Sequence, residues 1–183
     1  MHGLQDFTTD GTFVVPAGLT GIFVQAWGAG GGGAGAGGGG EIGGGGGGGG
    51  GFAWCQLTVT PGQTISVTIG QGGSGGSADM DGTVGGNTLV TALPSGSALA
   101  TGGLGAISGV GAPGGVGVCT PAGGAVRQGP TGKNGGPLPG AGASPAVDGI
   151  VAPGPTGAAQ GGGGGVGATP GGAGGNGYAV FWW

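Results

Sequence analysis

The side chains that could carry out catalysis are scarce in this chain. His2 is its single histidine and stands beside the first methionine. Nucleophilic catalysis by serine or cysteine needs a base such as histidine within hydrogen-bonding reach, and a third group to orient that base. One histidine at the start of the chain does not provide a recognisable dyad or triad. We therefore expect that the protein is not an enzyme.

The cysteines and acidic residues do not form a metal-binding pattern. Cys55 and Cys119 lie far apart, and neither belongs to a CxxC pair or has a histidine partner. We interpret both as free, small hydrophobic residues and predict no disulfide. The segment Asp79-Met80-Asp81-Gly82 is similar to the start of a calcium-binding loop, but the later ligands and the final glutamate are missing. We expect a solvated turn there, with no metal and no cofactor.

The charge of the chain excludes two classes of partner. The formal net charge is −4, and one arginine and one lysine, Arg127 and Lys133, supply the basic charge. Nucleic acid is bound by clustered basic residues, so we expect no nucleic-acid partner. No run of about 20 apolar residues is present, and the N-terminus lacks the charged and then apolar pattern of a signal peptide. We expect no membrane insertion and no export by the usual route, and Met1 suggests a complete small gene product.

Glycine dominates the elements that must position the remaining side chains. The segment from Gly28 to Gly51 is nearly all glycine, which fits either a slack linker or polyproline II helices packed side by side. Elsewhere glycine recurs every third residue, at positions 70, 73, 76, 82 and 85 and at 102, 105, 111, 114 and 117, with Asp79 and Ser108 as exceptions. Polyproline II has three residues per turn, so this period favours an ordered bundle.

The same period predicts which residues face the inside of the bundle. We expect Gly73 and Gly111 to face neighbouring backbones, and Ser74 and Ala112 to face outward. Bulky residues interrupt the glycine near the midpoints of two segments, at Glu41-Ile42 and at 78–81. Each glycine-rich excursion should therefore run out, turn and return.

Strand-like segments separate the glycine-rich ones. Residues 7–16 predict a hairpin or strand pair with Asp10-Gly11 as the turn. The alternating segments 52–60 and 63–69 predict a second hairpin, closed by a type II turn at Pro61-Gly62. A weaker hairpin is predicted for 87–101.

The remaining segments differ in their strand signal. Residues 22–27 are apolar on both faces, as in a strand inside a core. No strand is indicated from 102 to 176. Residues 178–183 have the composition of a strand.

The aromatic residues indicate how these segments come together. Five phenylalanines, four tryptophans and one tyrosine all fall at 7–54 or 178–183. Burying a large apolar side chain contributes about 1.5–3 kcal/mol, so the last strand must return beside the first ones. We expect a single all-β domain over 1–183, without α-helix. Its small antiparallel β-sandwich, from about 4–27, 52–69, 87–101 and 177–183, would clamp polyproline II excursions at 28–51, 70–86 and 102–176.

Several stretches together resemble a known family. They are GTFVVPAG at 11–18, IFVQAWGAGG at 22–31, LTVTPGQTISVTIG at 57–70, and the hydrophobic C-terminal strand. This pattern resembles the glycine-rich domain of bacteriophage tail-fibre and adhesin proteins, and it covers essentially the whole chain. A similar module occurs in some animal receptor kinases. The resemblance implies a β-sandwich with a polyproline II bundle on a virion component that attaches to host cells, with binding residues that vary in the loops.

We expect a viral structural protein, a tail-fibre tip or virion-surface fibre that is assembled in the host cytoplasm and mediates host attachment. Its partners would be other virion proteins and a host-surface carbohydrate or outer-membrane protein, and it could form a homo-oligomer such as a trimer. Loops on rigid scaffolds concentrate binding residues, so receptor contacts are expected where the glycine register fails. These candidates are Glu41, Ile42, Asp79, Asp81, Arg127, Gln128, Lys133, Asn134, Leu138, Asp148 and Ile150.

Two other functions fit the same composition. An ice-binding protein could use a flat polyproline II face with small side chains, although a bare bundle would not need the aromatic strands. A decoration or spacer protein would bind no receptor at all. In that case the segments around Arg127 and Lys133 would be plain solubilising turns.

Overall fold

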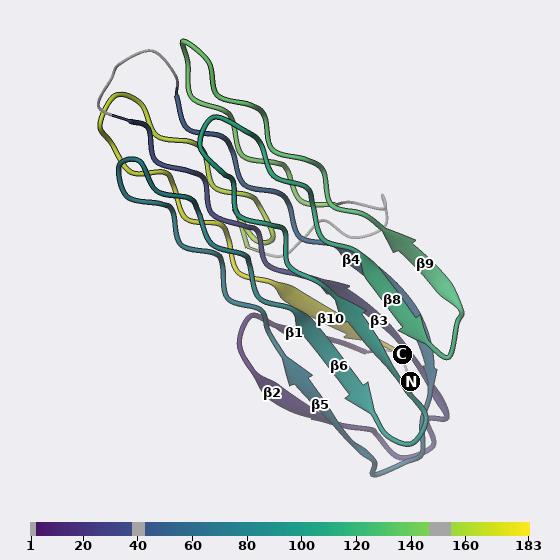
Figure 1. Ribbon diagram of the computed structural model, residues 1–183. Coiled ribbons are helices and arrows are strands. Elements are labelled where there is room, and N and C mark those ends of the chain that lie inside the picture. Colours follow the sequence, from purple (N-terminus) through teal and green to yellow (C-terminus); the bar gives the residue numbers. More distant parts are fainter. Residues whose placement is uncertain (1–2, 38–42, 147–154) are drawn as a thin grey trace.

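The molecule is elongated and has two parts, a β-sandwich and a bundle of glycine-rich segments that extends from it (Figure 1). The computed structural model describes residues 3–37, 43–146 and 155–183. Their regular secondary structure is all strand, without α-helix, which confirms the predicted all-β class. Accordingly, the described residues include no helix with the length and apolar character needed to cross a membrane.

The sandwich consists of two five-stranded antiparallel sheets. The first sheet contains, in spatial order, β1 (Leu4–Phe7), β10 (Tyr178–Trp182), β3 (Gly21–Trp27), β4 (Phe52–Thr58) and β9 (Gly124–Arg127). The second contains β2 (Gly11–Val14), β5 (Thr64–Thr68), β6 (Thr88–Ala92), β7 (Gly96–Ala100) and β8 (Gly117–Thr120). The C-terminal strand β10 lies between β1 and β3, so the last strand returns beside the first ones, as predicted.

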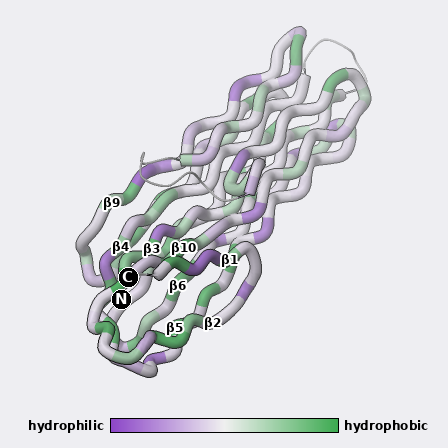
Figure 2. The backbone as a smooth tube through the Cα atoms, turned by 180° about the vertical axis from the view of Figure 1, so that it is seen from behind, coloured by the Kyte–Doolittle hydropathy of each residue, from purple (hydrophilic) through white to green (hydrophobic). Residues whose placement is uncertain are grey.

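Aromatic rings fill the space between the two sheets at the end near the termini. Phe181 on β10 is fully buried, and its ring centroid lies 5.2 Å from that of Phe7 and 5.1 Å from that of Phe13 on the opposite sheet. Such pairs contribute about 0.5–1.5 kcal/mol each beyond their buried area. The hydrophobic residues concentrate in the sandwich, whereas the bundle is nearly neutral in hydropathy (Figure 2). The sandwich core therefore supplies most of the apolar burial.

Two of the three predicted hairpins are wrong in their pairing. The strands β1 and β2 belong to different sheets, and so do β4 and β5. The turn at Pro61-Gly62 forms as predicted, since Gly62 has a φ of 78° and the Gln63 amide donates to the Thr60 carbonyl at 3.0 Å, but it carries the chain from one sheet to the other. Alternation of apolar residues specifies which face of a strand is buried and leaves its partner open. The weaker hairpin is confirmed, because β6 pairs with β7.

The prediction of free cysteines is also wrong. Cys55 on β4 and Cys119 on β8 form a disulfide, with an S–S distance of 2.00 Å and Cα atoms 5.6 Å apart. The bond joins the two sheets across the core. No strand was predicted at 102–176, yet β8 and β9 both lie there, each four residues long. Without β8, nothing in the sequence placed Cys119 beside Cys55.

Two segments of the bundle, 28–36 and 43–51, are buried along their whole length. Successive amides of 28–36 donate hydrogen bonds to three different neighbouring segments in turn. Gly28, Gly31 and Ala34 donate to the carbonyls of residues 51, 48 and 45 in one segment. In the same way, Ala29, Gly32 and Gly35 donate to residues 86, 83 and 80, and Gly30, Gly33 and Ala36 donate to residues 175, 172 and 169. The carbonyls of 28–36 accept from three more segments, at 73–79, 103–106 and 162–165. This threefold rotation of partners, without hydrogen bonds inside a segment, is the arrangement of a polyproline II bundle.

The number of neighbours explains the glycine pattern. A segment surrounded on every side has no room for large side chains, so 28–36 consists of glycine with three alanines and 43–51 of glycine alone. A β-carbon on Gly31 or Gly32 would overlap a carbonyl of the adjacent segment. A peripheral segment touches the bundle with one position in three, as at Gly129 and Gly132, which are buried between exposed residues. Uninterrupted glycine therefore marks the centre of the bundle, and the period of three marks its surface.

The predicted facing pattern holds with one correction. Gly73 and Gly111 both lie against backbone carbonyls, and Ser74 is exposed, as expected. Ala112, however, is buried in a small cluster with Ala34 and Ala106. The segment around Ala112 contacts the second central segment, 43–51, since the Ala112 amide donates to the Gly46 carbonyl. This segment therefore turns more than one of its three faces inward.

Candidate functional site

The described excursions reverse direction at the end of the bundle farthest from the sandwich (Figure 1). We call the turns at 78–80, 107–110, 136–138 and 166–169 the distal tip. Each is closed by a backbone hydrogen bond, for example from the Met80 amide to the Ser77 carbonyl at 2.9 Å and from Val110 to Ile107 at 2.9 Å. Both exceptions to the glycine period, Asp79 and Ser108, lie in these turns. The breaks in the register are therefore reversals of the chain.

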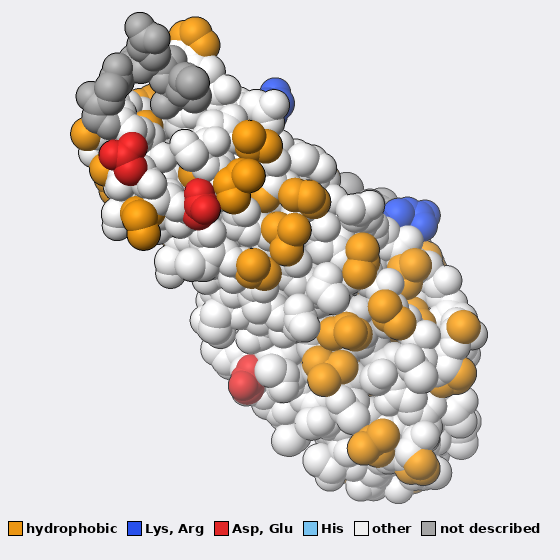
Figure 3. Space-filling view, viewed as in Figure 1, with side chains coloured by type: hydrophobic (Ala, Val, Ile, Leu, Met, Phe, Trp, Pro, Cys, Tyr) orange, Lys and Arg blue, Asp and Glu red, His pale blue; other side chains and the backbone are white. Residues whose placement is uncertain are grey.

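Each turn of the distal tip carries an exposed apolar side chain. Leu138 is 77% exposed and Met80 61% exposed, and Ile107 and Val166 are exposed as well. Asp79 and Asp81 are exposed at the same end, and Figure 3 shows acidic side chains on one side of the bundle and a basic one on the other, while further charged side chains lie at the sandwich. The distal tip thus offers apolar contacts with isolated charges at their edge, a surface that suits recognition by shape and by a few polar contacts.

The two predicted aspartates have different positions in the tip. Asp79 has a φ of 62° and an exposed side chain, so it occupies the left-handed position of its turn. Aspartate adopts this conformation more readily than most residues. Asp81 is also exposed, but its Oδ1 accepts a hydrogen bond from the Ser108 amide at 3.1 Å. Asp81 therefore ties two turns of the tip together.

Lys133, Asn134 and Leu138 belong to one excursion that reaches the tip. The Asn134 Oδ1 accepts from the Gly111 amide at 2.9 Å, so this side chain completes the backbone hydrogen bonding of a neighbouring segment. Lys133 has an exposed side chain, while its amide donates to the Ala141 carbonyl at 2.9 Å. Leu138 projects from the turn itself. Lys133 and Leu138 are thus the members of this group that are best placed for an external contact.

Other predicted site residues do not lie at the distal tip. Arg127 is the last residue of β9, and Gln128 follows it, so both lie at the sandwich end of the bundle. We predicted both as tip residues because a charged residue suggested a turn of the chain, and the position predicted for them is wrong. Residues 145 and 146 also lie beside the sandwich, where the Trp27 Nε1 donates to the Ala146 carbonyl at 2.7 Å. Glu41, Ile42, Asp148 and Ile150 fall outside the described residues.

Three polar side chains that were not predicted as functional complete the hydrogen bonding of the bundle. Asn87 Oδ1 accepts from Gly102, Asn176 Oδ1 from Gly72, and Thr88 Oγ1 from Gly70, at 3.1, 2.9 and 3.2 Å. Each lies where a glycine-rich segment meets a strand. In the sequence, a polar residue between a glycine-rich segment and a strand is the feature that could have indicated this role. These residues are part of the scaffold, because their acceptor atoms are already used.

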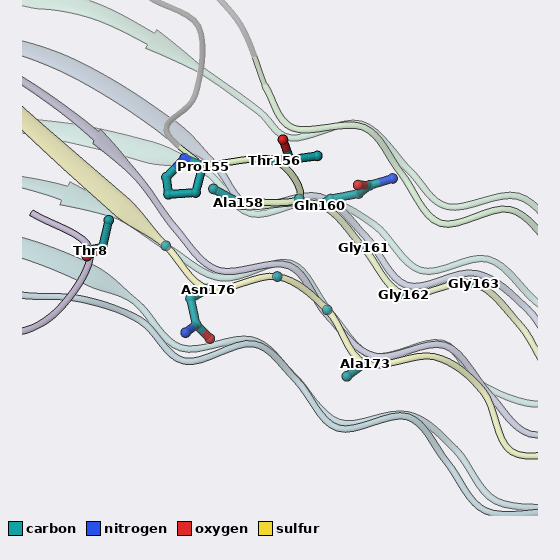
Figure 4. A pocket seen from close by; sticks show the side chains of 14 residues that line it. Thr8, Pro155, Thr156, Ala158, Gln160, Gly161, Gly162, Gly163, Ala173 and Asn176 are labelled. Carbon is teal, nitrogen blue, oxygen red and sulfur yellow. The ribbon is translucent and has the colours of Figure 1, made fainter.

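A pocket of about 590 Å³ lies where the bundle joins the sandwich. Its wall is formed by Thr8 and by residues 155–158, 160–163 and 173–177. Figure 4 shows that the side chains of Gln160 and Asn176 point in different directions, so they do not converge on one bound atom. The wall is otherwise mostly glycine backbone. No group of three or more His, Cys, Asp or Glu that could hold a metal is found in the described part of the chain.

A family model described as a glycine-rich domain matches residues 8–183. The chain belongs to this glycine-rich domain family. A search of curated proteins finds no match. The matched range includes strands β2 to β10 and the glycine-rich segments, so it covers both parts of the molecule.

The arrangement of this glycine-rich domain separates scaffold from surface. The backbone groups of the central segments are used by their neighbours, and the polar side chains at the junctions are used as well. Fewer of the side chains in the turns of the distal tip take part in such hydrogen bonds. Rigid elements that carry variable turns are a common arrangement for binding proteins.

Proposed function

We propose that this glycine-rich domain is an attachment module of a virion, in which the distal tip binds a receptor on the host cell. The observation that carries the proposal is the position of Asp79, Met80, Ile107 and Leu138 at the end of a backbone-bonded bundle, away from both termini. A tip held at a distance from its anchor suits contact with another surface. The resemblance to bacteriophage tail-fibre and adhesin proteins agrees with this role.

The physical properties of the bundle support the proposal. Fixing the backbone of one residue costs about 1–2 kcal/mol in conformational entropy, and a backbone hydrogen bond contributes only about 1 kcal/mol of net stability. A glycine bundle without the sandwich would therefore be only marginally stable. The sandwich holds both ends of each excursion close together, so each excursion is a shorter loop and the entropic cost of closing it is lower. Residues in the turns can then change without loss of the interior hydrogen bonds.

The proposed setting is the outside of a virus particle. The sandwich would contact other virion proteins, and assembly would take place in the host cytoplasm, as a monomer or as a homo-oligomer such as a trimer. A disulfide between Cys55 and Cys119 suits a protein that works on a virion surface, where the environment is oxidising. The receptor would be a cell-surface carbohydrate or an outer-membrane protein.

Two leucines provide a matched test. Leu138 at the distal tip is 77% exposed and Leu93, in the β6–β7 turn of the sandwich, is 73% exposed, and each precedes a proline. Fluorescently labelled protein is incubated with a panel of bacterial strains and bound fluorescence is measured by flow cytometry. We expect L138S to reduce binding at least about tenfold, equal to about 1.4 kcal/mol, and L93S to leave it unchanged.

Two results would favour the other functions. Equal binding by the tip variant and by L93S, or no binding to any strain, would favour a decoration or spacer protein. Inhibition of ice recrystallisation by the unmodified protein would favour an ice-binding bundle.

A further inference from the structure

A second candidate surface lies on the sandwich, far from the distal tip. Phe23 on β3, Trp54 on β4 and Trp182 on β10 form a continuous group on the outer face of the first sheet, which we call the aromatic platform. The ring centroids of Phe23 and Trp182 are 6.0 Å apart with an interplanar angle of 19°, and those of Trp54 and Trp182 are 6.4 Å apart at 38°. The rings are therefore closer to parallel than to edge-on.

The aromatic platform has no counterpart on the other sheet. Strands β5 to β8 of the second sheet contain no aromatic residue. Phe23 is 37% exposed, and Trp54 and Trp182 are half-buried, so the platform keeps apolar surface in contact with water. The rings that fill the core, such as Phe181 and Phe13, point to the opposite side of the strands. Trp54 and Trp182 pack on one side against a second hydrophobic cluster that includes Phe52 and Tyr178, while Phe23 belongs to no buried cluster of the described residues and extends the aromatic surface beyond it.

A pocket of about 520 Å³ adjoins the aromatic platform. Its wall consists of Phe23 and Trp54, the exposed polar residues Gln56 and Thr58, the β8–β9 turn at 121–123 and the first two residues of β9. Strand β9 pairs with β4 only from Phe52 to Cys55, so among the described residues the last part of β4 has no strand beside it on that edge. Backbone and side-chain polar groups of β4 are thus free to face the pocket beside an aromatic ring.

The chemistry of the wall selects a class of ligand. None of its residues is charged, which disfavours nucleic acids and other polyanions. Gln56 offers both a donor and an acceptor, and Thr58 a hydroxyl group. A sugar ring has apolar C–H groups on its face and hydroxyl groups at its rim. Its face can therefore stack on an aromatic side chain while its hydroxyl groups form hydrogen bonds with a neighbouring amide and hydroxyl. We propose that this pocket binds a saccharide, with a pyranose ring against Trp54 and its hydroxyl groups hydrogen-bonded to Gln56 and Thr58.

The saccharide site is independent of the attachment function proposed for the distal tip. The test uses the full chain and two sets of probes, methyl pyranosides and hexasaccharides such as maltohexaose and chitohexaose. Binding is followed by tryptophan fluorescence and by isothermal titration calorimetry. We expect at least one probe to bind and to shift the tryptophan emission, and preference for hexasaccharides over methyl pyranosides would identify a glycan chain as the ligand.

Variants locate the binding. We expect Q56L to weaken saccharide affinity about fivefold to tenfold, which corresponds to loss of one hydrogen bond. W54L should abolish detectable binding and W54F should restore part of it, because phenylalanine keeps an aromatic face. Q5L, at an exposed glutamine on β1 of the same sheet, is the matched control and should bind like the unmodified protein.

Three results would overturn the proposal. The first is absence of binding for every probe at concentrations up to about 10 mM, where an affinity near −3 kcal/mol would still be detected. The second is unchanged affinity in Q56L and W54L variants that fold normally by circular dichroism. The third is binding of a protein partner, rather than a saccharide, that these substitutions remove.

Discussion

Gly31 and Gly48 meet at the centre of the bundle, where the Gly31 amide donates to the Gly48 carbonyl at 2.9 Å. Both residues belong to fully buried segments that run antiparallel, so their backbones touch without side chains between them. A β-carbon on either residue would overlap a carbonyl of a third segment, that of Leu104 or of Pro113. The interior of the bundle is thus held by backbone hydrogen bonds, which strengthen one another in a poorly hydrated environment.

The first prediction concerns hydrogen exchange in this interior. Amides at Gly31, Gly32 and Gly33 donate to three different segments, so they should open only when the bundle separates. We expect them to exchange at least about a hundredfold more slowly than amides of an unstructured peptide. Exchange is measured by mass spectrometry after peptic digestion. If 28–36 exchanges at the unstructured rate while β3 and β4 remain protected, the bundle is not formed in solution.

The second prediction uses two adjacent glycines in one segment. A β-carbon on Gly162 would overlap the Gly172 carbonyl, whereas one on Gly163 would meet only the Gly140 carbonyl oxygen, at 4.0 Å. We expect G162A to lower the free energy of unfolding by about 2 kcal/mol or more, because overpacking of backbone cannot relax locally. G163A should be neutral or stabilising by about 0.4–1 kcal/mol, since alanine restricts the unfolded chain.

Chemical denaturation of both variants provides the comparison. The two substitutions add the same methyl group one residue apart, so composition and helix or strand propensity do not separate them. Equal losses of stability would mean that the facing pattern of the bundle is wrong.

The fold was predictable where a segment carries its own period. The apolar strand at 22–27, the final strand at 178–182 and the glycine triplets all have a local pattern that matches the structure. Pairing was not predictable, because the alternation in 52–69 fits a hairpin and a crossing between sheets equally well. The sequences GVCT and GAVR of β8 and β9 are short and begin with glycine, so they have no strand signal.

The candidate site was predictable only in part, for a similar reason. Asp79 was placed correctly because a break in a regular period marks a turn. Arg127 was misplaced because charge marks an exposed position and not a reversal of the chain. The aromatic platform was not predicted, since Trp54 and Trp182 read as core residues until the sheets show which side of each strand faces outward.

The third prediction concerns the disulfide. Cys55 and Cys119 are separated by 64 residues, and a cross-link that closes such a loop restricts the unfolded chain strongly. We expect the double variant C55A/C119A to lose about 2–4 kcal/mol of unfolding free energy, measured by denaturant titration. The unmodified protein under reducing conditions should lose a similar amount. A variant as stable as the oxidised protein would show that the two sheets need no covalent link.

The fourth prediction concerns Tyr178, the chain's single tyrosine. Burial raises the pKa of Tyr178 above its ordinary value of 10.0, and the nearby negative charge of Asp6 and a side-chain hydrogen bond with Asp6 raise it further. The folded protein therefore holds the phenolic proton at a pH where the unfolded chain has released it. Because the native state binds more protons in that range, the stability contributed by Tyr178 is complete below about pH 10 and falls as the pH rises from there through the folded-state pKa.

Ultraviolet absorbance at 295 nm follows this titration directly, since no other tyrosine contributes. We expect the native protein to titrate at higher pH than the same protein in denaturant. D6N should bring the native pKa of Tyr178 closer to its ordinary value, because it removes the charge of Asp6, but burial should keep the pKa raised. In Y178F the unfolding free energy should depend less steeply on pH above about 10. Coincident titration curves for the native and denatured protein would contradict the burial of Tyr178 between β10 and the adjoining bundle.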